Sequence, residues 1–227
     1  MTLLNPCSRI LLVLLLLAPG PVMPGETVRV GEFSSGLLDQ WRERGFVGRT
    51  VYQLVEMDGR MVVHADSHAS ASGLYRPVSV DLERTPVLNW SWRVDALIRG
   101  NDERSRAGDD YPARVYVVFS GGARFWRTRA INYVWSSRQP AGSEWPNAFT
   151  ANARMIAVAS GVVGLGEWQH PRRNVLEDYR RLFGGNPPGV DAVAIMTDSD
   201  NTGQGAEAWY GDIWFSASPA PASSAAE

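Results

Sequence analysis

The clearest pattern in the chain is a strict alternation of apolar and polar residues over 87–94, VLNWSWRV. One face of this segment carries Leu88, Trp90, Trp92 and Val94, and the other face carries polar side chains. A period of two predicts a β-strand with one buried face. Short extended runs rich in β-branched and aromatic residues recur along the chain, at 50–55, 61–64, 74–80, 111–120, 125–127, 130–136 and 153–159.

Turn residues and prolines organise the first of these runs. The runs at 50–55 and 61–64 flank Asp58-Gly59, a pair that favours the tight turn of a β-hairpin. Pro77 lies in the run at 74–80 and cannot donate a ladder hydrogen bond, so it predicts an edge strand. A short helix is expected at 36–44, ending at Gly45.

One segment instead has the 3.6-residue period of a helix. Asn174 is placed to cap this helix, Glu177 follows at capping-box spacing, and Gly184 ends it. Its apolar stripe consists of Val175, Leu176, Tyr179, Leu182 and Phe183. Many short strands and one short amphipathic helix predict a mostly antiparallel, jelly-roll-like β-sandwich, because alternating βαβ units would need more helices.

The segment 191–215 predicts two strands joined by an acidic loop at 197–205. Asp198, Asp200 and Asn201 lie in the loop, and Asp212 lies in the second strand; their oxygens are ligands of the kind that calcium prefers. An EF-hand is excluded, because Trp209 stands where that motif needs a glutamate. A turn capped by Asp and Asn side chains is the alternative, and both interpretations stay open here.

The two ends of the chain differ from its middle. Arg9 precedes the apolar run 10–18, and Pro and Gly residues follow, so residues 1–25 are expected to be a signal peptide. The run is far shorter than the roughly 20 residues that span a bilayer, so no transmembrane span is expected after cleavage. We expect a single sandwich domain at 26–215, a disordered tail at 216–227, and a periplasmic or secreted protein.

The composition excludes several kinds of binding and catalytic chemistry. The 227 residues carry a net charge of -2, so no basic field indicates nucleic-acid binding. Every one of the 22 basic residues is arginine, which excludes lysine chemistry such as a Schiff base. The single cysteine, Cys7, lies in the expected signal peptide, which leaves no thiol for a disulfide or a catalytic role in the mature chain.

The aromatic content is high, with nine Trp and seven Tyr. Aromatic rings stack on the C–H faces of sugars while neighbouring polar groups bind hydroxyls. Four aromatic residues in loop-rich sequence are the candidates for such a platform: Trp126, Tyr133, Trp135 and Trp145. The alternative is that these side chains form a wide aromatic core.

Three functions are consistent with these features. The first is a non-catalytic module that binds a carbohydrate or an envelope glycan through the aromatic platform and the acidic loop, with or without calcium. The second is a glycan hydrolase, which needs two carboxyl groups across the scissile bond; the candidates are Asp109, Asp110, Asp198 and Asp200. The third is a structural envelope protein with no small ligand. No G-x-S-x-G nucleophile motif occurs.

Five motifs resemble an exported bacterial family known as domain of unknown function 3047: RVYVVF (114–119), INYVW (131–135), RNVLEDYRRLFG (173–184), IMTDSDNTG (195–203) and AWYGDIWF (208–215). This resemblance covers 87–215 and implies an exported bacterial domain, without an established activity. The last of these motifs also resembles the final strand of galactose-binding-like jelly rolls, which implies carbohydrate binding or scaffolding.

Overall fold

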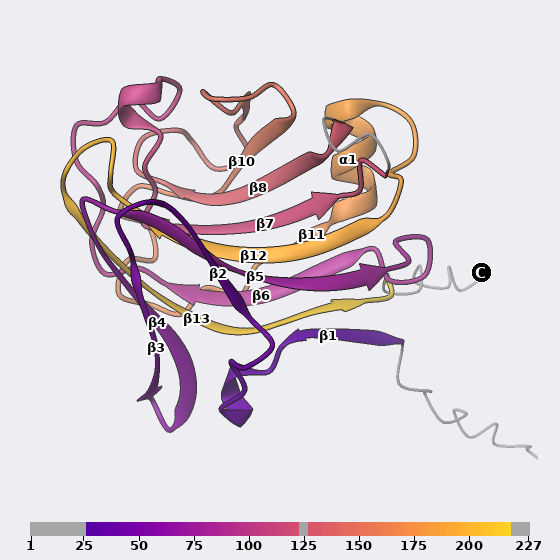
Figure 1. Ribbon diagram of the computed structural model, residues 1–227, viewed down its shortest axis with the longest axis horizontal. Coiled ribbons are helices and arrows are strands. Elements are labelled where there is room, and N and C mark those ends of the chain that lie inside the picture. Colours follow the sequence, from indigo (N-terminus) through magenta and orange to yellow (C-terminus); the bar gives the residue numbers. More distant parts are fainter. Residues whose placement is uncertain (1–25, 123–126, 219–227) are drawn as a thin grey trace, which may run out of the picture.

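The computed structural model describes residues 26–122 and 127–218, which form two β-sheets packed face to face (Figure 1). The six-stranded sheet has the order β11 (Arg172–Asn174), β6 (Val87–Arg93), β13 (Gly205–Ser216), β4 (Arg60–His68) and β3 (Val51–Met57), with β1 (Thr27–Gly31) also paired to β13. The seven-stranded sheet has the order β2 (Arg42–Val47), β5 (Ala71–Val80), β12 (Val190–Asp198), β7 (Ala113–Phe119), β8 (Arg129–Ser136), β10 (Ala153–Ser160) and β9 (Glu144–Pro146). Only β8 and β10 pair in parallel among the described strands, so the predicted antiparallel β-sandwich is confirmed.

Aromatic side chains from both sheets meet in the core. Trp90 of β6 packs on Tyr133 of β8 with ring centroids 5.4 Å apart, and Trp92 packs on Trp135 at 6.2 Å. All four side chains are buried. The alternation over 87–94 therefore identified correctly the face of β6 that packs on the aromatic side chains of β8, but the other face is not exposed, because Asn89 and Ser91 are also buried.

The predicted hairpin is present as β3 and β4. Its turn residues Asp58 and Gly59 both have positive φ, 53° and 76°, which is the geometry of a type I′ turn. Met57 pairs with Arg60 across this turn. The two-residue turn therefore sets the register of the hairpin.

Two expectations near the N-terminus are wrong. Residues 36–44 form no helix: the 3-10 helix η1 (Phe33–Ser35) ends at Gly36, and β2 starts at Arg42. Trp41 packs on Phe33 with centroids 5.2 Å apart, so core packing overrides local helix propensity here. β5 is not an edge strand, since it lies between β2 and β12. However, β2 pairs only with residues 71–75 of β5, so Pro77 lies where that side of β5 has no partner strand.

The predicted helix is confirmed as α1 (Val175–Phe183), at one end of the sandwich (Figure 1). The Asn174 side chain accepts a hydrogen bond from the Glu177 amide at 3.2 Å, as its spacing indicated. Asp178, buried at the start of α1, accepts hydrogen bonds from Arg173 and from the Tyr133 hydroxyl, both at 2.9 Å. These bonds tie the helix to the core.

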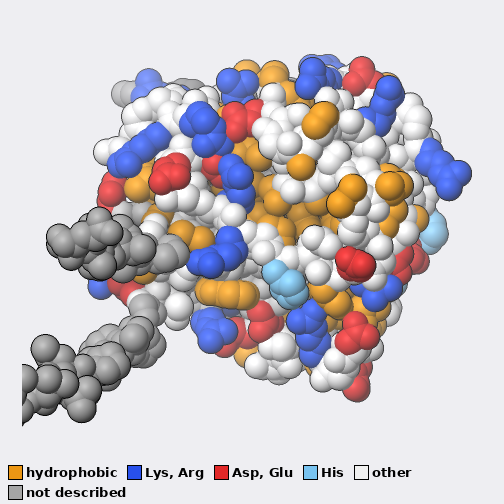
Figure 2. Space-filling model, turned by 180° about the vertical axis from the view of Figure 1, so that it is seen from behind, with side chains coloured by type: hydrophobic (Ala, Val, Ile, Leu, Met, Phe, Trp, Pro, Cys, Tyr) orange, Lys and Arg blue, Asp and Glu red, His pale blue; other side chains and the backbone are white. Residues whose placement is uncertain are grey.

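The structure bears only in part on the expected ends of the domain. β13 continues to Ser216, which pairs with Thr27 and Val87, so the sandwich includes one residue of the expected tail. The expected signal peptide, most of the expected tail and most of the expected strand at 125–127 lie outside the described residues. Within the described ranges, no helix is long and apolar enough to cross a membrane. Figure 2 shows basic and acidic side chains interspersed over one face, consistent with the small net charge.

Candidate functional site

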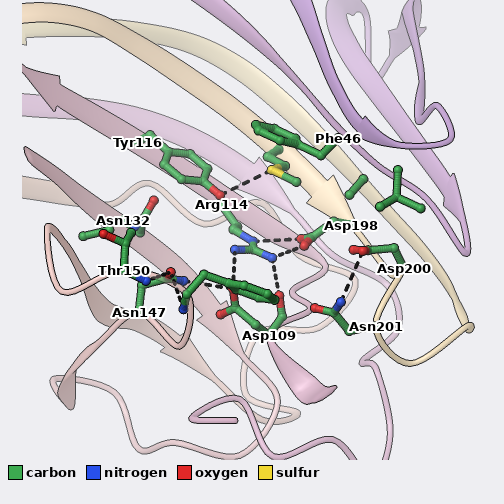
Figure 3. A pocket seen from close by; sticks show the side chains of 15 residues that line it. Phe46, Asp109, Arg114, Tyr116, Asn132, Asn147, Thr150, Asp198, Asp200 and Asn201 are labelled. Carbon is green, nitrogen blue, oxygen red and sulfur yellow. Dashed lines mark hydrogen bonds and ion pairs between the residues drawn. The ribbon is translucent and has the colours of Figure 1, made fainter. Parts of the chain in front are cut away.

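A cavity of about 450 Å³ opens on the outer face of the seven-stranded sheet (Figure 3). Its floor follows from strand alternation: Val115 and Val117 of β7 face the core, whereas Arg114 and Tyr116 face outward into the cavity. The β7–β12 register pairs Met196 with Arg114, which brings the end of β12 beside the start of β7. The other strands and loops at the cavity contribute Phe46, Val47, Ala71, Asp109, Asn132, Asn147, Phe149, Thr150, Ala153, Asp198, Asp200 and Asn201.

The charged loop at 99–110 forms one wall, and buried polar contacts hold it in place. The Asn101 side-chain amide donates to the carbonyl oxygens of Gly108 and Asp110, at 3.0 and 3.1 Å. Glu103 is buried and accepts a hydrogen bond from the Ser137 amide at 2.5 Å. The Tyr111 hydroxyl donates to the Glu103 carbonyl oxygen at 3.0 Å. These bonds hold the loop against the rest of the chain, although Asn101 Oδ1 and Asp109 Oδ1 accept no hydrogen bond from the described residues.

Arg114 occupies the centre of the cavity floor, and only 3% of its surface is exposed. Its Nε donates to Asp198 Oδ1 at 2.8 Å, and its Nη2 donates to Asp198 Oδ2. Its Nη1 lies 3.7 Å from Asp109 Oδ2. This two-pronged pair neutralises Asp198 and joins β7 to the end of β12, and each partner needs the other because an unpaired charge is costly at this depth.

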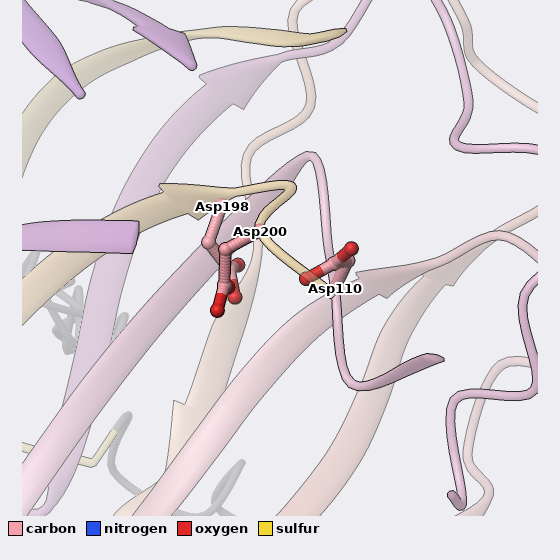
Figure 4. Close-up of side chains that lie close together, drawn as sticks. All are labelled: Asp110, Asp198 and Asp200. Carbon is pink, nitrogen blue, oxygen red and sulfur yellow. The ribbon is translucent and has the colours of Figure 1, made fainter. Parts of the chain in front are cut away.

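Three carboxylates gather where β12 ends. Asp110, Asp198 and Asp200 each place one carboxylate oxygen within 4.8 Å of the others (Figure 4). Asp110 also accepts hydrogen bonds from the amides of Asn201 and Thr202, at 3.2 and 2.6 Å. The acidic loop is therefore braced by side chain to backbone hydrogen bonds, and the brace comes from Asp110 on another loop. Calcium binding by Asp198, Asp200 and Asn201 stays a prediction.

Burial and mutual repulsion shift the pKa values of these acids. Burial raises the pKa of Asp198, against the opposing effect of the Arg114 guanidinium. Burial, followed by the nearby charge of Asp110, raises the pKa of Asp200. Burial also raises the pKa of Asp109, although Arg114 and Asn147 oppose the shift. Burial, the largest cause of all three shifts, thus disfavours the charged form of each acid, and the neighbouring carboxylates disfavour additional negative charge.

Two hydrogen-bond acceptors on the cavity wall have no partner. Oδ1 of Asp109 and Oδ1 of Asn132 are buried and accept no hydrogen bond from any of the described residues. The other carboxylate oxygen of Asp109 accepts from the Asn147 amide at 2.9 Å. A buried acceptor without a partner costs free energy, so a donor that reached either oxygen would stabilise it.

The rim of the cavity is aromatic. Phe46 of β2 is 62% exposed and Phe149 is 53% exposed, and both side chains line the cavity. A second cavity of about 320 Å³ shares Phe46, Tyr116 and Met196 with the first and continues past Tyr75 and Arg44. The two cavities therefore adjoin each other on the outer face of the sheet, and together they are called the groove below.

A family model described as "Protein of unknown function (DUF3047)" matches residues 39–214. The chain belongs to the DUF3047 family. The match confirms the resemblance of the five motifs and extends it from residue 87 back to residue 39, so the groove lies within the DUF3047 domain. A search of curated proteins found no match.

Solved structures similar to the DUF3047 domain include three from glycan-related proteins. The family 30 carbohydrate-binding module of a Clostridium thermocellum cellulosomal cellulase has a TM-score of 0.48 and 10% identity, covering 85% of this chain and 98% of that one. The family 11 carbohydrate-binding module of another cellulosomal cellulase from that organism has a TM-score of 0.46 and 9% identity, covering 83% and 96%. The xyloglucanase domain of NopAA, a type three effector from Sinorhizobium fredii, has a TM-score of 0.45 and 9% identity, covering 88% and 100%. At these values, the similarity carries no conclusion about a ligand of this chain.

The structure corrects the predicted aromatic platform of the DUF3047 domain. Tyr133 and Trp135 lie in the core between the sheets, and Trp145 is buried beneath the 99–110 loop with Tyr111 and Met155. Buried rings cannot stack on a ligand, so the aromatic-core alternative holds for these three residues. Trp126 lies outside the described residues.

The predicted polar residues are divided between two places. Asp198, Asp200 and Asn201 line the cavity of the DUF3047 domain, and their role in binding stays a prediction. Asp212 does not join them, because it lies in β13 of the other sheet and accepts hydrogen bonds from the Ser34 amide and hydroxyl at 2.8 and 2.5 Å. The acid that joins Asp198 and Asp200 instead is Asp110, which the sequence makes a candidate only for the hydrolase.

Two kinds of sequence signal point to the missed cavity residues. Arg114 and Asn132 are polar residues inside otherwise apolar strands, RVYVV and INYVW. An outward-facing polar residue in such a strand marks the position where the outer face carries a site. Phe46 stands in a strand whose residues are all exposed. Its neighbour Val47 is also exposed, and adjacent exposed apolar residues are a feature of contact surfaces.

Proposed function

We propose that this DUF3047 domain is a non-catalytic module that binds a glycan of the cell envelope after export, with the sugar lying in the groove on the seven-stranded sheet. The observation that carries this proposal is the pairing of two exposed phenylalanines, Phe46 and Phe149, with two buried acceptors that lack partners, Asp109 Oδ1 and Asn132 Oδ1. A sugar has both complementary features, since its C–H face stacks on aromatic rings and its hydroxyls donate hydrogen bonds.

The size of the groove supports the same ligand class. Its main cavity, about 450 Å³, falls within the range of small-ligand sites, roughly 300–1,000 Å³. The adjoining region past Tyr75 adds about 320 Å³, so a chain of sugars fits better than a single compact metabolite. The groove lies on the outer face of a sheet whose strands are hydrogen-bonded to one another, which favours binding without a large conformational change.

A glycan hydrolase is the second candidate, because carboxyl groups with raised pKa values in a cavity can act as general acids. Asp198 is committed to Arg114, so Asp109 and Asp200 are the remaining acid candidates on the cavity wall. This candidate requires that Asp200→Asn lower turnover of a bound glycan by orders of magnitude. The binding module requires that the wild-type protein leave bound glycans intact.

The test is isothermal titration of the mature protein with soluble oligosaccharides and envelope-glycan fragments, using Phe46→Ala and Phe149→Ala. Each substitution removes an exposed ring from the rim, so we expect about tenfold weaker binding, or about 1.4 kcal/mol, with little change in Tm. Val163→Ala is the matched control, because Val163 is a more exposed apolar residue that does not line the groove.

Three other outcomes would contradict the proposal. If a glycan binds equally well to both phenylalanine variants, the groove is not its site. If no glycan binds at all, the structural-protein hypothesis gains, and it predicts no ligand-induced rise in Tm. Turnover of a bound glycan would favour the hydrolase.

A further inference from the structure

The charged side chains of the main cavity are unbalanced. Among the described residues that line the cavity, the charged ones are Asp109, Asp198, Asp200 and Arg114. Arg114 pairs with Asp198 and also lies 3.7 Å from Asp109, so one guanidinium faces three carboxylates, and Asp200 has no ion pair with any of the described residues. Asp110, just behind the loop, adds a further negative charge near Asp200. The cavity is therefore locally acidic although the whole protein carries a net charge of only -2.

The nearest basic side chains do not offset this charge. The Arg106 guanidinium lies over the Phe149 ring, 5.4 Å from its centroid, and its Nε donates to the Ala148 carbonyl oxygen. Arg106 is exposed, so solvent screens its charge. Arg44 lines the adjoining part of the groove and not the main cavity.

The polar atoms that lack partners have the same preference. Asp109 Oδ1 and Asn132 Oδ1 are both acceptors, so the missing partners must be donors. An ammonium group has hydrogen-bond donors and no acceptor, and its positive charge offsets the excess negative charge of the cavity. A neutral hydroxyl satisfies one acceptor but leaves the charge imbalance in place.

We propose that the cavity prefers a glycan with free amino groups, such as a deacetylated amino sugar, and binds its ammonium group beside the carboxylate of Asp200, with the carboxylate of Asp109 adding negative charge on the cavity wall. This inference rests on the proposed function and specifies its substrate class. Asn132 then accepts from a hydroxyl of the sugar. Binding a cation beside Asp200 also offsets the repulsion from Asp110, which adds to burial in raising the pKa of Asp200. An N-acetylated sugar carries no charge at this position and gains none of this stabilisation.

The test compares three oligosaccharides of equal length by isothermal titration at neutral pH: glucosamine oligomers, their N-acetylated counterparts and neutral glucose oligomers. We expect the glucosamine oligomers to bind at least about tenfold more tightly than the other two, a difference of about 1.4 kcal/mol. The preference should shrink as ionic strength rises from about 0.01 M to about 1 M, over which the Debye length falls from about 30 Å to about 3 Å.

Two variants locate the effect. Asp200 is half-buried and accepts a hydrogen bond from its neighbour Asn201. The Asp200→Asn variant should therefore fold normally and lose most of the preference for the amino form. Asp109→Asn should do the same. Asp191→Asn is the matched control, because Asp191 is an exposed aspartate on the same strand, β12, and lies outside the groove.

The outcomes separate this inference from the proposed function. Equal or tighter binding of a neutral or acetylated oligomer would overturn the inference and leave the proposed function standing. A preference for the amino form that Asp191→Asn removes as fully as Asp200→Asn would reflect the overall charge of the protein and would also overturn it. Binding of none of the three oligomers would count against both.

Discussion

Trp135→Ala distinguishes the core from the groove. The sequence makes Trp135 a candidate for stacking on a ligand, but in the structure its side chain is completely buried. Its ring packs on Trp92 with centroids 6.2 Å apart, and its Nε1 donates to the Gly161 carbonyl oxygen at 3.2 Å. Truncation therefore removes a large contact between the two sheets, a buried hydrogen bond and the volume of an indole.

The expected loss is large. Truncation of a buried tryptophan costs about 3–5 kcal/mol, and for a domain of this length each kcal/mol lowers Tm by roughly 2–4 °C, so a fall of about 10 °C is expected. Phe149→Ala is the comparison, because its ring is 53% exposed and a surface change costs within about 0.5 kcal/mol. Thermal and urea unfolding of both variants, beside glycan titration, gives stability and binding separately.

We expect opposite effects in the two variants. Trp135→Ala should lose stability and, where it remains folded, keep its glycan affinity; Phe149→Ala should keep its stability and lose affinity. A Trp135→Ala protein that melts with the wild type but no longer binds would refute the assignment of the β8 aromatics to the core. It would also reverse which face of the seven-stranded sheet is the binding face.

Two further predictions concern the floor and wall of the cavity. Arg114→Met leaves the Asp198 carboxylate buried without its partner, so we expect urea unfolding to show a loss of about 3–5 kcal/mol in the free energy of unfolding. The double variant Arg114→Met/Asp198→Leu should recover most of this loss. Equal losses in the single and the double variant would contradict the pairing. Because burial raises the pKa of Asp109 in the folded protein, the folded state binds more protons, and its stability falls as the pH rises from the ordinary aspartate value, about 3.9, through the raised pKa. The Tm of Asp109→Asn should therefore fall less steeply with pH than that of the wild type over this range, and parallel curves would contradict the shift.

Much of the fold could be predicted because local pattern and tertiary burial agree there. The alternation in β6, the Asp-Gly turn between β3 and β4, and the capped stripe of α1 each have one low-energy interpretation. No helix forms at 36–44, because in this short segment the packing of Trp41 on Phe33 outweighs the local helix propensity.

The sequence could not show which aromatic side chains face solvent, because apolar and polar residues do not alternate in β8. Residues 131–136 of this strand are all buried, since the core covers one face and the 99–110 loop, with Trp145 and Tyr111, covers part of the other. An apolar run buried on both faces gives no sign of which aromatic side chains face solvent. The exposed rings, Phe46 and Phe149, lie instead in polar segments.

The acidic site depends on contacts that local sequence does not encode. β12 and β13 are consecutive strands, yet they belong to different sheets, so the loop between them crosses from one sheet to the other at the end of the groove. That crossing moves Asp212 away from the loop and presents Asp198 and Asp200 to residues of the loop before β7. Asp110 reaches the backbone of Asn201 across 91 positions of sequence, and Arg114 reaches Asp198 across 84. A balanced overall composition therefore conceals a local excess of negative charge, created when the chain brings two acidic loops together around one arginine. The chemistry of the ligand follows from that local excess, which is why a charged and a neutral sugar of the same shape are the ligands to compare.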